Sequence, residues 1–388
     1  MSKLEELIQE FCLNGVEYYE LGQVCDFIKG KGLRKDDIGT GNIPIILYGE
    51  LYTTYSGYIN QVVSSAASEK INRKAAIYKS DIIIPLSSTT KEANIGQAAV
   101  YASNRVAYLG SDAAILRHSM DAGYLMYVLN SSFFEKEKMR CVSGTTIRHL
   151  SINELSKIRI PLPPLAVQQE IVRILDSFTE LTAELTAELT ARRKQYEHYR
   201  DELLTFGEDV QRRKLVDSCD ICRGVRVVRK QLSNSGRYPV FQNSLSPLGF
   251  YEKANCRANT TFIITAGAAG SLGYSSTEFW AADDCYFFEC AKDVILDKFL
   301  FYALDSQQEK ILSMVRKASI PRLGRSSIEN LSIPIPSLPV QESIVSILDS
   351  FSVICNNLIF GLPAEIAARQ KQYEYYRDKL LTFKELDT

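Results

Sequence analysis

Cysteine and histidine side chains are the first candidates for chemistry in this sequence. Cys219 and Cys222 form a C-x-x-C pair, but a structural zinc site needs a second ligand pair, and none follows at a suitable spacing. An internal repeat, described below, matches Cys219 with Cys25 and Cys222 with Ile28, so we interpret both cysteines as small buried residues. Of the three histidines, His149 in the stretch TTIRHL is the one we expect to contact a ligand. The sequence predicts no metal site.

The glycine-rich segments do not fit a nucleotide or methyl-donor site. GKG at 30–32 and GTG at 39–41 lack the strand, third glycine and helix of a dinucleotide-binding turn, and a G-x-x-x-x-G-K-S/T phosphate loop does not occur. PLPP at 161–164 has no Asn or Asp before it and so differs from an amino-methyltransferase motif. GAAGS at 267–271 favours a tight turn over a phosphate cradle. We therefore predict neither a catalytic centre nor a bound cofactor.

Polar and basic loops remain, and their chemistry is that of binding. Lys and Arg can bind phosphates, while Asn, Ser, Thr and Arg can hydrogen-bond to base edges. In the first half of the chain the candidates for DNA binding are Lys29, Lys31, Arg34, Lys35, Thr53, Thr54, Ser87, Ser88, Thr89, Thr90, Lys91, Arg148 and His149. In the second half they are Arg223, Arg226, Arg229, Lys230, Gln242, Asn243, Ser244, Arg316, Lys317, Arg322 and Arg325. Each alone could equally be a solvated loop residue, but their recurrence in both halves favours a binding surface.

The composition narrows the class of protein. The chain has 388 residues and a net charge of −1, so nucleic-acid binding would need local basic patches. No apolar run approaches twenty residues, which predicts no membrane span. The N-terminal MSKLEELIQEF is charged and amphipathic, unlike a signal peptide, and the nine cysteines indicate reduced thiols. We expect a cytoplasmic protein of two or three domains.

The chain repeats itself along its length. IPLPPLAVQQEIVRILDSF at 160–178 recurs as IPIPSLPVQESIVSILDSF at 333–351, and RRKQYEHYRDELLTF at 192–206 recurs as RQKQYEYYRDKLLTF at 369–383. Because the proline-rich stretches interrupt regular structure, we divide the chain at them. The predicted segments are an N-terminal helix with a first globular head (1–159), a first long helix (160–206), a second head (207–332) and a second long helix (333–388). The helices repeat closely while the heads diverge, which indicates one scaffold with two specialised heads.

Both long helices carry an apolar seam with steps of three and four residues. The seam runs from Ile171 to Leu203 in the first helix and from Ile344 to Leu380 in the second. Two such seams predict an antiparallel pair. Pro363, in the stretch GLPA, should end or kink the second helix. In the first helix, LTAELTAELTA at 181–191 repeats one helix-favouring tetrapeptide in tandem.

The heads have the pattern of mixed α/β domains. Predicted strands cover 43–48, 81–86, 97–102 and 113–118 in the first head, and 239–241, 260–266 and 284–290 in the second. One helix is predicted in each, at 124–138 and 297–315. The fold class is therefore α+β, with two mixed α/β domains separated by two long helices that pack as an antiparallel coiled coil, and with an internal pseudo-two-fold repeat.

At these residues the sequence resembles the specificity subunit of a type I restriction–modification system. The resemblance rests on PLPPLAVQQEIVRILDSF and its second copy, on the two KQYE-x-YRD-x-LLTF blocks and on the TAEL tandem, which is similar to the subgroup called type IC. It covers essentially the whole chain and is weakest in the heads. It implies a non-catalytic subunit whose heads are target recognition domains, each reading one half of a bipartite, asymmetric site in double-stranded DNA.

The resemblance also implies partners and a role for the helices. Two modification subunits would carry S-adenosylmethionine, and restriction subunits would use ATP and magnesium, while this chain would bind no cofactor. In related subunits the number of TAEL copies follows the gap between half-sites, so each unit, about 6 Å of helix and about 400° of turn, would act as a ruler. Contacts to the modification subunits would fall on the repeated helices, where the matching candidates are Gln168, Glu170, Tyr196, Tyr199, Arg200, Gln341, Tyr373, Tyr376 and Arg377.

Two other functions remain open from the residues alone. A self-contained DNA methyltransferase or nuclease would need a cofactor loop or a carboxylate–lysine cluster, which the sequence lacks, and it would methylate DNA without a partner. A coiled-coil interaction protein without a DNA role would show no sequence preference in mobility shifts, with or without a modification subunit. We favour a DNA-sequence reader that also serves as an assembly scaffold.

Overall fold

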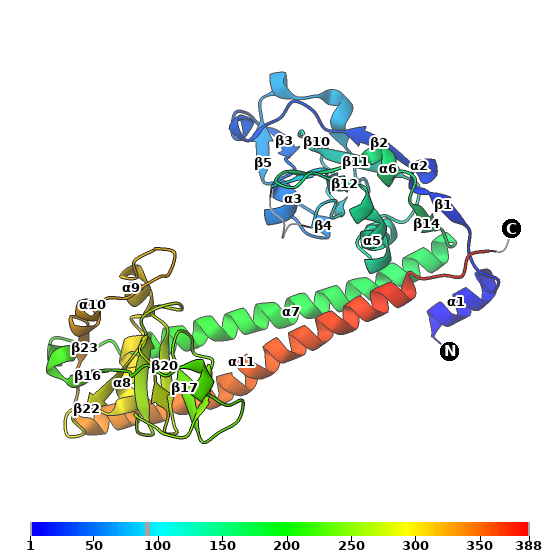
Figure 1. Ribbon diagram of the computed structural model, residues 1–388. Coiled ribbons are helices and arrows are strands. Elements are labelled where there is room, and N and C mark those ends of the chain that lie inside the picture. Colours follow the sequence, from blue (N-terminus) through cyan, green and yellow to red (C-terminus); the bar gives the residue numbers. More distant parts are fainter. Residues whose placement is uncertain (1, 90–93, 387–388) are drawn as a thin grey trace. The chain divides into compact units, whose positions relative to one another are not determined.

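The computed structural model describes residues 2–89 and 94–386, which fold as two compact units. The first unit combines Met1–Leu185 with Glu365–Thr388, and the second comprises Thr186–Ala364. Each unit contains one head, the beginning of the long helix that follows this head and the end of the other long helix (Figure 1). These units therefore cut across the four segments that we predicted from the sequence.

Both long helices form where the sequence predicts them. Helix α7 covers Leu165–Leu203 and includes the TAEL tandem. The hydroxyls of Thr182 and Thr190 donate to the carbonyl oxygens four residues earlier, at 2.9 Å each, which satisfies these polar groups within the helix. Helix α11 covers Leu338–Leu380, so of the two outcomes predicted at Pro363, an end of the helix is wrong and a kink stays a prediction. A proline removes one backbone N–H donor, and the helical turns before and after Pro363 continue the helix despite this missing hydrogen bond.

The first head is built from small sheets. A five-stranded sheet has the order β2 (Cys25–Lys29), β11 (Ala113–His118), β7 (Ile82–Pro85), β9 (Ala99–Tyr101) and β4 (Tyr58–Ile59). A four-stranded sheet has the order β5 (Ser64–Ala66), β3 (Ile43–Ile46), β10 (Ala107–Leu109) and β6 (Ala76–Ile77). A three-stranded sheet has the order β12 (Val142–Ser143), β13 (Arg148–Leu150) and β8 (Ser87–Ser88), and β1 (Tyr18–Glu20) pairs with β14 (Arg159–Pro161). The helices are α1 (Lys3–Phe11), α2 (Leu21–Val24), α3 (Glu50–Thr53), α4 (Ala122–Leu129), α5 (Ser132–Arg140) and α6 (Ile152–Leu155), with 3-10 turns η1 (Lys35–Asp37), η2 (Ser68–Lys70) and η3 (Arg73–Ala75).

The second head has the same organisation with fewer strands. A four-stranded sheet has the order β16 (Cys219–Arg223), β22 (Cys285–Cys290), β19 (Thr260–Ile264) and β20 (Leu272–Ser275). A three-stranded sheet has the order β18 (Gly249–Tyr251), β17 (Tyr238–Phe241) and β21 (Trp280–Ala281), and β15 (Arg212–Lys214) pairs with β23 (Ser332–Pro334). The helices are α8 (Asp297–Asp305), α9 (Gln308–Ser313) and α10 (Arg325–Glu329), with 3-10 turns η4 (Leu215–Asp217) and η5 (Arg229–Gln231).

The single helix predicted in each head is two helices in the structure. In the first head, Ser131 separates α4 from α5, because its side chain accepts a hydrogen bond from the Phe134 amide and so caps the start of α5. In the second head the break falls at Ser306 and Gln307. The Gln307 amide group donates to the carbonyl oxygens of Ala303 and Ser332, both at 3.1 Å, and thereby holds the turn against β23.

The two heads share one hydrogen-bonded framework although their sequences differ. The strand pairs β2–β11 and β16–β22 are antiparallel, while β3–β10 and β17–β21 are parallel. Gly30 donates its N–H to the carbonyl oxygen of Ala113, and Gly224 donates to Cys285 in the same way, both at 2.9 Å. A side chain at either glycine would meet carbonyl oxygen at about 2 Å (1.8 Å from Gly110 and 2.1 Å from Ala282), which explains a glycine at both positions.

Each long helix begins in the hydrophobic core of the head that precedes it. Ile171 and Leu175 of α7 pack in one buried cluster with Tyr124 of α4 and Leu116 of β11. One buried glutamine then fixes the start of each helix. Gln168 accepts the Asp121 N–H and donates to the Pro163 carbonyl oxygen at 2.9 and 2.8 Å. Gln341 likewise accepts the Leu296 N–H and donates to the Pro336 carbonyl oxygen, again at 2.9 and 2.8 Å.

A tyrosine–aspartate pair ties each head to its helix about two turns beyond the glutamine. Tyr127 of α4 donates to Asp176 of α7 at 2.5 Å, and Tyr302 of α8 donates to Asp349 of α11 at 2.6 Å. Each aspartate has a second partner in the head, Tyr58 for Asp176 and Lys298 for Asp349. Burial, followed by the neighbouring carboxylate, raises the pKa of both Tyr127 and Tyr302 well above the usual range. The two phenols therefore stay protonated and act as donors.

Within each unit the end of one long helix packs against the beginning of the other. Phe178 of α7 stacks on Tyr376 of α11 in the first unit, and Tyr199 of α7 stacks on Phe351 of α11 in the second. The first unit is closed by the chain ends, because Val16 donates its N–H to Lys384 and accepts from Leu386. Within the described part of the chain, no helix is long and apolar enough to cross a membrane.

Replacing Tyr127 by Phe tests the tyrosine–aspartate pair, because the ring is kept and only the donor is lost. We expect Tyr127→Phe to lower the stability of the first unit by about 1.5–3 kcal/mol, as for other hydrogen bonds to charged groups. Native-state hydrogen exchange of α4 and the first turns of α7 measures this loss. Tyr78→Phe is the control, since Tyr78 is exposed, and should change stability by less than about 0.5 kcal/mol. Equal protection in Tyr127→Phe and the wild type would contradict the assignment.

Candidate nucleic-acid interface

In the first head the structure joins two loops that the sequence predicted separately. Strand β8, with Ser87 and Ser88, pairs with β13, so that Arg148 lies opposite Ser88 and His149 opposite Ser87. The Ser87 hydroxyl lies 2.9 Å from His149 Nδ1 and donates to Asp112 at 3.1 Å. His149 is exposed, whereas both serines are buried. The serines therefore position the basic strand and are not themselves on the surface.

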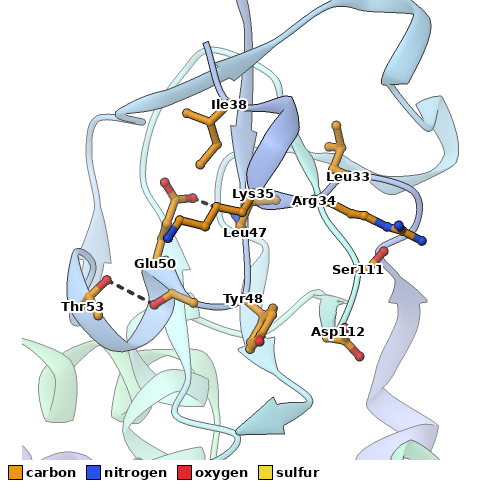
Figure 2. A pocket seen from close by; sticks show the side chains of 11 residues that line it. Leu33, Arg34, Lys35, Ile38, Leu47, Tyr48, Glu50, Thr53, Ser111 and Asp112 are labelled. Atoms are coloured by element: carbon orange, nitrogen blue, oxygen red, sulfur yellow. Dashed lines mark hydrogen bonds between the residues drawn. The ribbon is translucent and has the colours of Figure 1, made fainter. Parts of the chain in front are cut away.

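A cavity of about 720 Å³ lies beside this sheet and gathers three more of the predicted residues. Figure 2 shows Arg34, which precedes η1, with Lys35 of η1, Thr53 of α3 and Asp112 around it. Asp112 belongs to both places, because it lines the cavity and also accepts the Ser87 hydrogen bond. The guanidinium, ammonium and hydroxyl groups can bind phosphates or base edges. Leu33, Ile38 and Leu47 give the cavity a largely apolar wall, and Asp112 connects it to the β8–β13 strands.

In the second head the predicted loops meet around Asp283. Arg223, at the end of β16, donates to the Asp283 carbonyl oxygen at 3.2 Å, and Gln242 donates to its carboxylate at 3.3 Å. The carbonyl oxygen of Asn243 accepts the Ala268 N–H at 2.9 Å. Arg322 forms backbone bridges with both Ala266 and Arg316. These contacts link four loops, at 223–230, 241–247, 265–271 and 316–325, to one another or to Asp283.

The remaining residues predicted to contact DNA have fewer hydrogen bonds to the loops described above. Lys29, Lys31, Thr54, Thr89, Arg226, Arg229, Lys230 and Lys317 are exposed on the loops or strand ends where the sequence placed them. Ser244 donates to the Ser246 carbonyl oxygen within its own loop, and Arg325 forms an ion pair with Glu329 of α10. Thr90 and Lys91 lie outside the described residues.

The residues predicted to contact a partner subunit mostly make contacts inside the chain. Gln168 and Gln341 are buried in the hydrogen bonds described above, and Glu170, 3% exposed, is paired with Arg173 and Lys3. For these three the prediction of a partner contact is wrong, because their side chains do not reach the surface.

The tyrosines and arginines near the ends of the long helices also bind the heads. Arg200 pairs with Asp305 at 2.7 Å, and Arg377 donates to the Ser132 hydroxyl at 3.0 Å. Tyr373 packs edge-on against Tyr127, and Tyr196 packs against the core of the second unit. Tyr199 and Tyr376, stacked on phenylalanines, keep exposed edges. Partner contact by these two stays a prediction.

Two cysteines of the second head face each other in its strand framework. Cys219 and Cys290 face each other across β16–β22, with sulfur atoms 3.1 Å apart, and both are buried. Cys222 is half-buried. Among the described residues, no group of three or more His, Cys, Asp or Glu side chains is arranged to hold a metal ion.

The sequence analysis did not predict several residues of the candidate interface, although comparison of the two repeats could have indicated some of them. Asp112 and Asp283 lie in the turns before β11 and β22, where Asp284 takes the backbone position of Asp112, but acidic residues were not sought there. Tyr52, which donates to the Ser87 carbonyl oxygen at 2.9 Å, lies beside the chosen Thr53. The nonlocal pairing of β8 with β13 decides these contacts, and single-sequence patterns do not specify it.

A family model and individual relatives identify the same protein family. Residues 14–192 and 207–368 each match the type I restriction modification DNA specificity domain. A type I restriction enzyme specificity subunit from Escherichia coli is 30% identical over 298 residues, covering 68% of this chain and 72% of the relative. The MpnII specificity subunit from Mycoplasma pneumoniae is 28% identical over 306 residues, covering 61% of this chain and 92% of the relative.

Solved structures agree with the fold. The crystal structure of a type I restriction–modification S subunit from M. genitalium superposes with a TM-score of 0.61 at 18% identity and covers 95% of this chain and 96% of that one. A chain from a structural study of type I complex assembly and conformational transition gives 0.58 at 17% identity, with 95% and 97% covered. With two matched domains that span most of its length, the chain belongs to the family of type I restriction–modification DNA specificity subunits.

Proposed function

We propose that this chain is the DNA sequence-recognition subunit of a type I restriction–modification enzyme. Each head would read one half of a bipartite, asymmetric target, and the two long helices would pack as an antiparallel coiled coil that sets the unread gap. Family membership supports DNA recognition over a self-contained methyltransferase and over a scaffold without a DNA role. The chain would itself be non-catalytic.

The observation that carries this proposal is one backbone framework with two different sets of surface side chains. The register β8–β13 places His149 opposite Ser87, and the matching bridge places Arg322 opposite Ala266. Gly110 donates to Ile46 at the position where Ala282 donates to Phe241. Tyr48 and Asn243, two residues after these carbonyl groups, therefore correspond. Two readers that share a frame but differ in donors and acceptors suit an asymmetric target.

The catalytic groups would come from partner subunits. Two modification subunits would bind S-adenosylmethionine, and restriction subunits would use ATP and magnesium, in the cytoplasm where the host DNA lies. The exposed edges of Tyr199 and Tyr376 on the long helices support a docking role for these helices. Cysteine thiols that stand free in the described part of the chain suit a reducing compartment.

Exchange of the first head tests the two-reader arrangement. Residues 14–159 are replaced by the first head of another family member that retains the tyrosine facing Asp176. Because only one reader changes, we expect one half of the methylated motif to change while the other half and the gap persist. Sequencing of the methylated motifs made with the modification subunits measures this, and the unchanged chain with the same partners is the control. A change in both halves would contradict separate readers.

Deletion of Thr186–Leu189, one TAEL unit of α7, tests the ruler. The deletion removes about 6 Å and about 400° of helix, so both half-sites should persist while the unread gap shortens. Glu188→Gln is the length-preserving control and should leave the gap unchanged. The methylated motif again gives the answer, and an unchanged gap after the deletion would rule the ruler out.

A further inference from the structure

Each head carries a short β-hairpin that the framework holds at the same place. In the first head, Ser143 pairs with His149, and in the second, Arg316 pairs with Arg322. Five residues connect the paired positions in both hairpins, GTTIR at 144–148 and KASIP at 317–321. The two hairpins are therefore equivalent in length and register, although four of their five tip residues differ.

The residue that the tips share is an exposed isoleucine. Ile147 is 50% exposed and Ile320 is 54% exposed, and each lies two residues before the paired position on the returning side of its hairpin. A single exposed isoleucine is ordinary on a protein surface. The same isoleucine in both tips, among residues that otherwise differ, indicates a common contact. Packing inside the head does not supply it, since half of each side chain reaches solvent.

The base of each hairpin is rigid and joined to the candidate interface. Leu150 and Leu323, which follow the paired positions, are buried. Their N–H groups donate to the carbonyl oxygens of Leu86 and Thr265 at 2.8 and 2.9 Å. The carbonyl oxygens of Asp112 and Asp284 accept from the N–H groups of the same two residues, Leu86 and Thr265, at 2.7 and 2.8 Å. Each apolar tip is thus fixed relative to the polar residues around it.

Charge and shape indicate duplex DNA as the occupant. Arg148 and His149 follow the first tip residue Ile147, while Arg316, Lys317 and Arg322 surround the second. The major groove of B-DNA is wide enough for a two-stranded β-ribbon, and the apolar group that bases present there is the thymine methyl. The neighbouring cations suit the phosphates on either side of the groove.

We propose that the hairpins 143–149 and 316–322 enter the major groove, and that Ile147 and Ile320 each contact the C5-methyl group of one thymine per half-site. This inference rests on the proposed DNA recognition and adds the reading element and one base contact. His149 and Arg322, at the same register beside the isoleucines, then give the two heads different polar contacts.

Thymine-to-uracil substitution tests the contact, because it removes only the methyl group. The full-length protein, assembled with its modification subunit, is titrated with a duplex that carries its methylated motif. In a series of such duplexes, each thymine is replaced in turn by uracil. We expect one position per half-site to weaken binding about fourfold, the effect of one buried methyl group. Ile320→Ala should abolish the sensitivity in one half-site and leave the other, and Ile147→Ala should do the reverse.

Val106→Ala and Val216→Ala are matched controls, since both valines are exposed in the heads and lie outside the hairpin segments 143–149 and 316–322, and they should retain both sensitivities. If the isoleucine variants keep both sensitivities, or if no thymine is sensitive while binding stays sequence-specific, the inference is wrong and the proposed function stands. If the wild type shows no sequence preference, the proposed function fails as well. Loss of modification-subunit binding by the isoleucine variants, with DNA binding intact, would identify the tips as a protein contact and overturn the inference.

Discussion

The architecture depends on a hydrogen bond between a buried tyrosine of each head and an aspartate of the long helix that follows. Tyr127 donates to Asp176 and Tyr302 to Asp349. Hydrogen bonds to a carboxylate are stronger than those between neutral groups, and loss of the donor would leave a partly buried charge less well paired. Because the same pair forms in both units, each head is fixed to its helix at the same point. The position of each long helix therefore determines the position of the head that precedes it.

Such a frame allows the surfaces to differ without loss of the fold. The glycine contacts at Gly30 and Gly224 and the strand registers recur in both heads, whereas the loops that leave this framework carry different side chains. His149 and Arg322 show the difference most directly, since both lie at the return of an equivalent hairpin. Function on a shared fold resides in such grafted surface residues, and a duplicated fold with two surfaces is suited to two different half-sites.

The repeat made the two long helices predictable from the sequence, since α7 and α11 each begin directly after a proline-rich stretch. The strand at 113–118 was likewise placed by its β-branched and apolar residues. The contacts of the interface were not predictable, because β8 and β13 are two and three residues long and pair across about sixty positions of the chain. Gln168 and Gln341 illustrate a further limit, as a repeated polar residue suggests a surface contact until burial shows that it fixes the backbone.

Selection from a library of randomised duplexes measures the central claim most directly. The full-length protein, with its modification subunits, is allowed to bind the library, and the bound duplexes are sequenced. The account predicts two specified sequences that differ from each other and are separated by an unread gap of constant length, as expected for two fixed readers with different surfaces. Recovery of one continuous motif, or of duplexes without any preference, would contradict it.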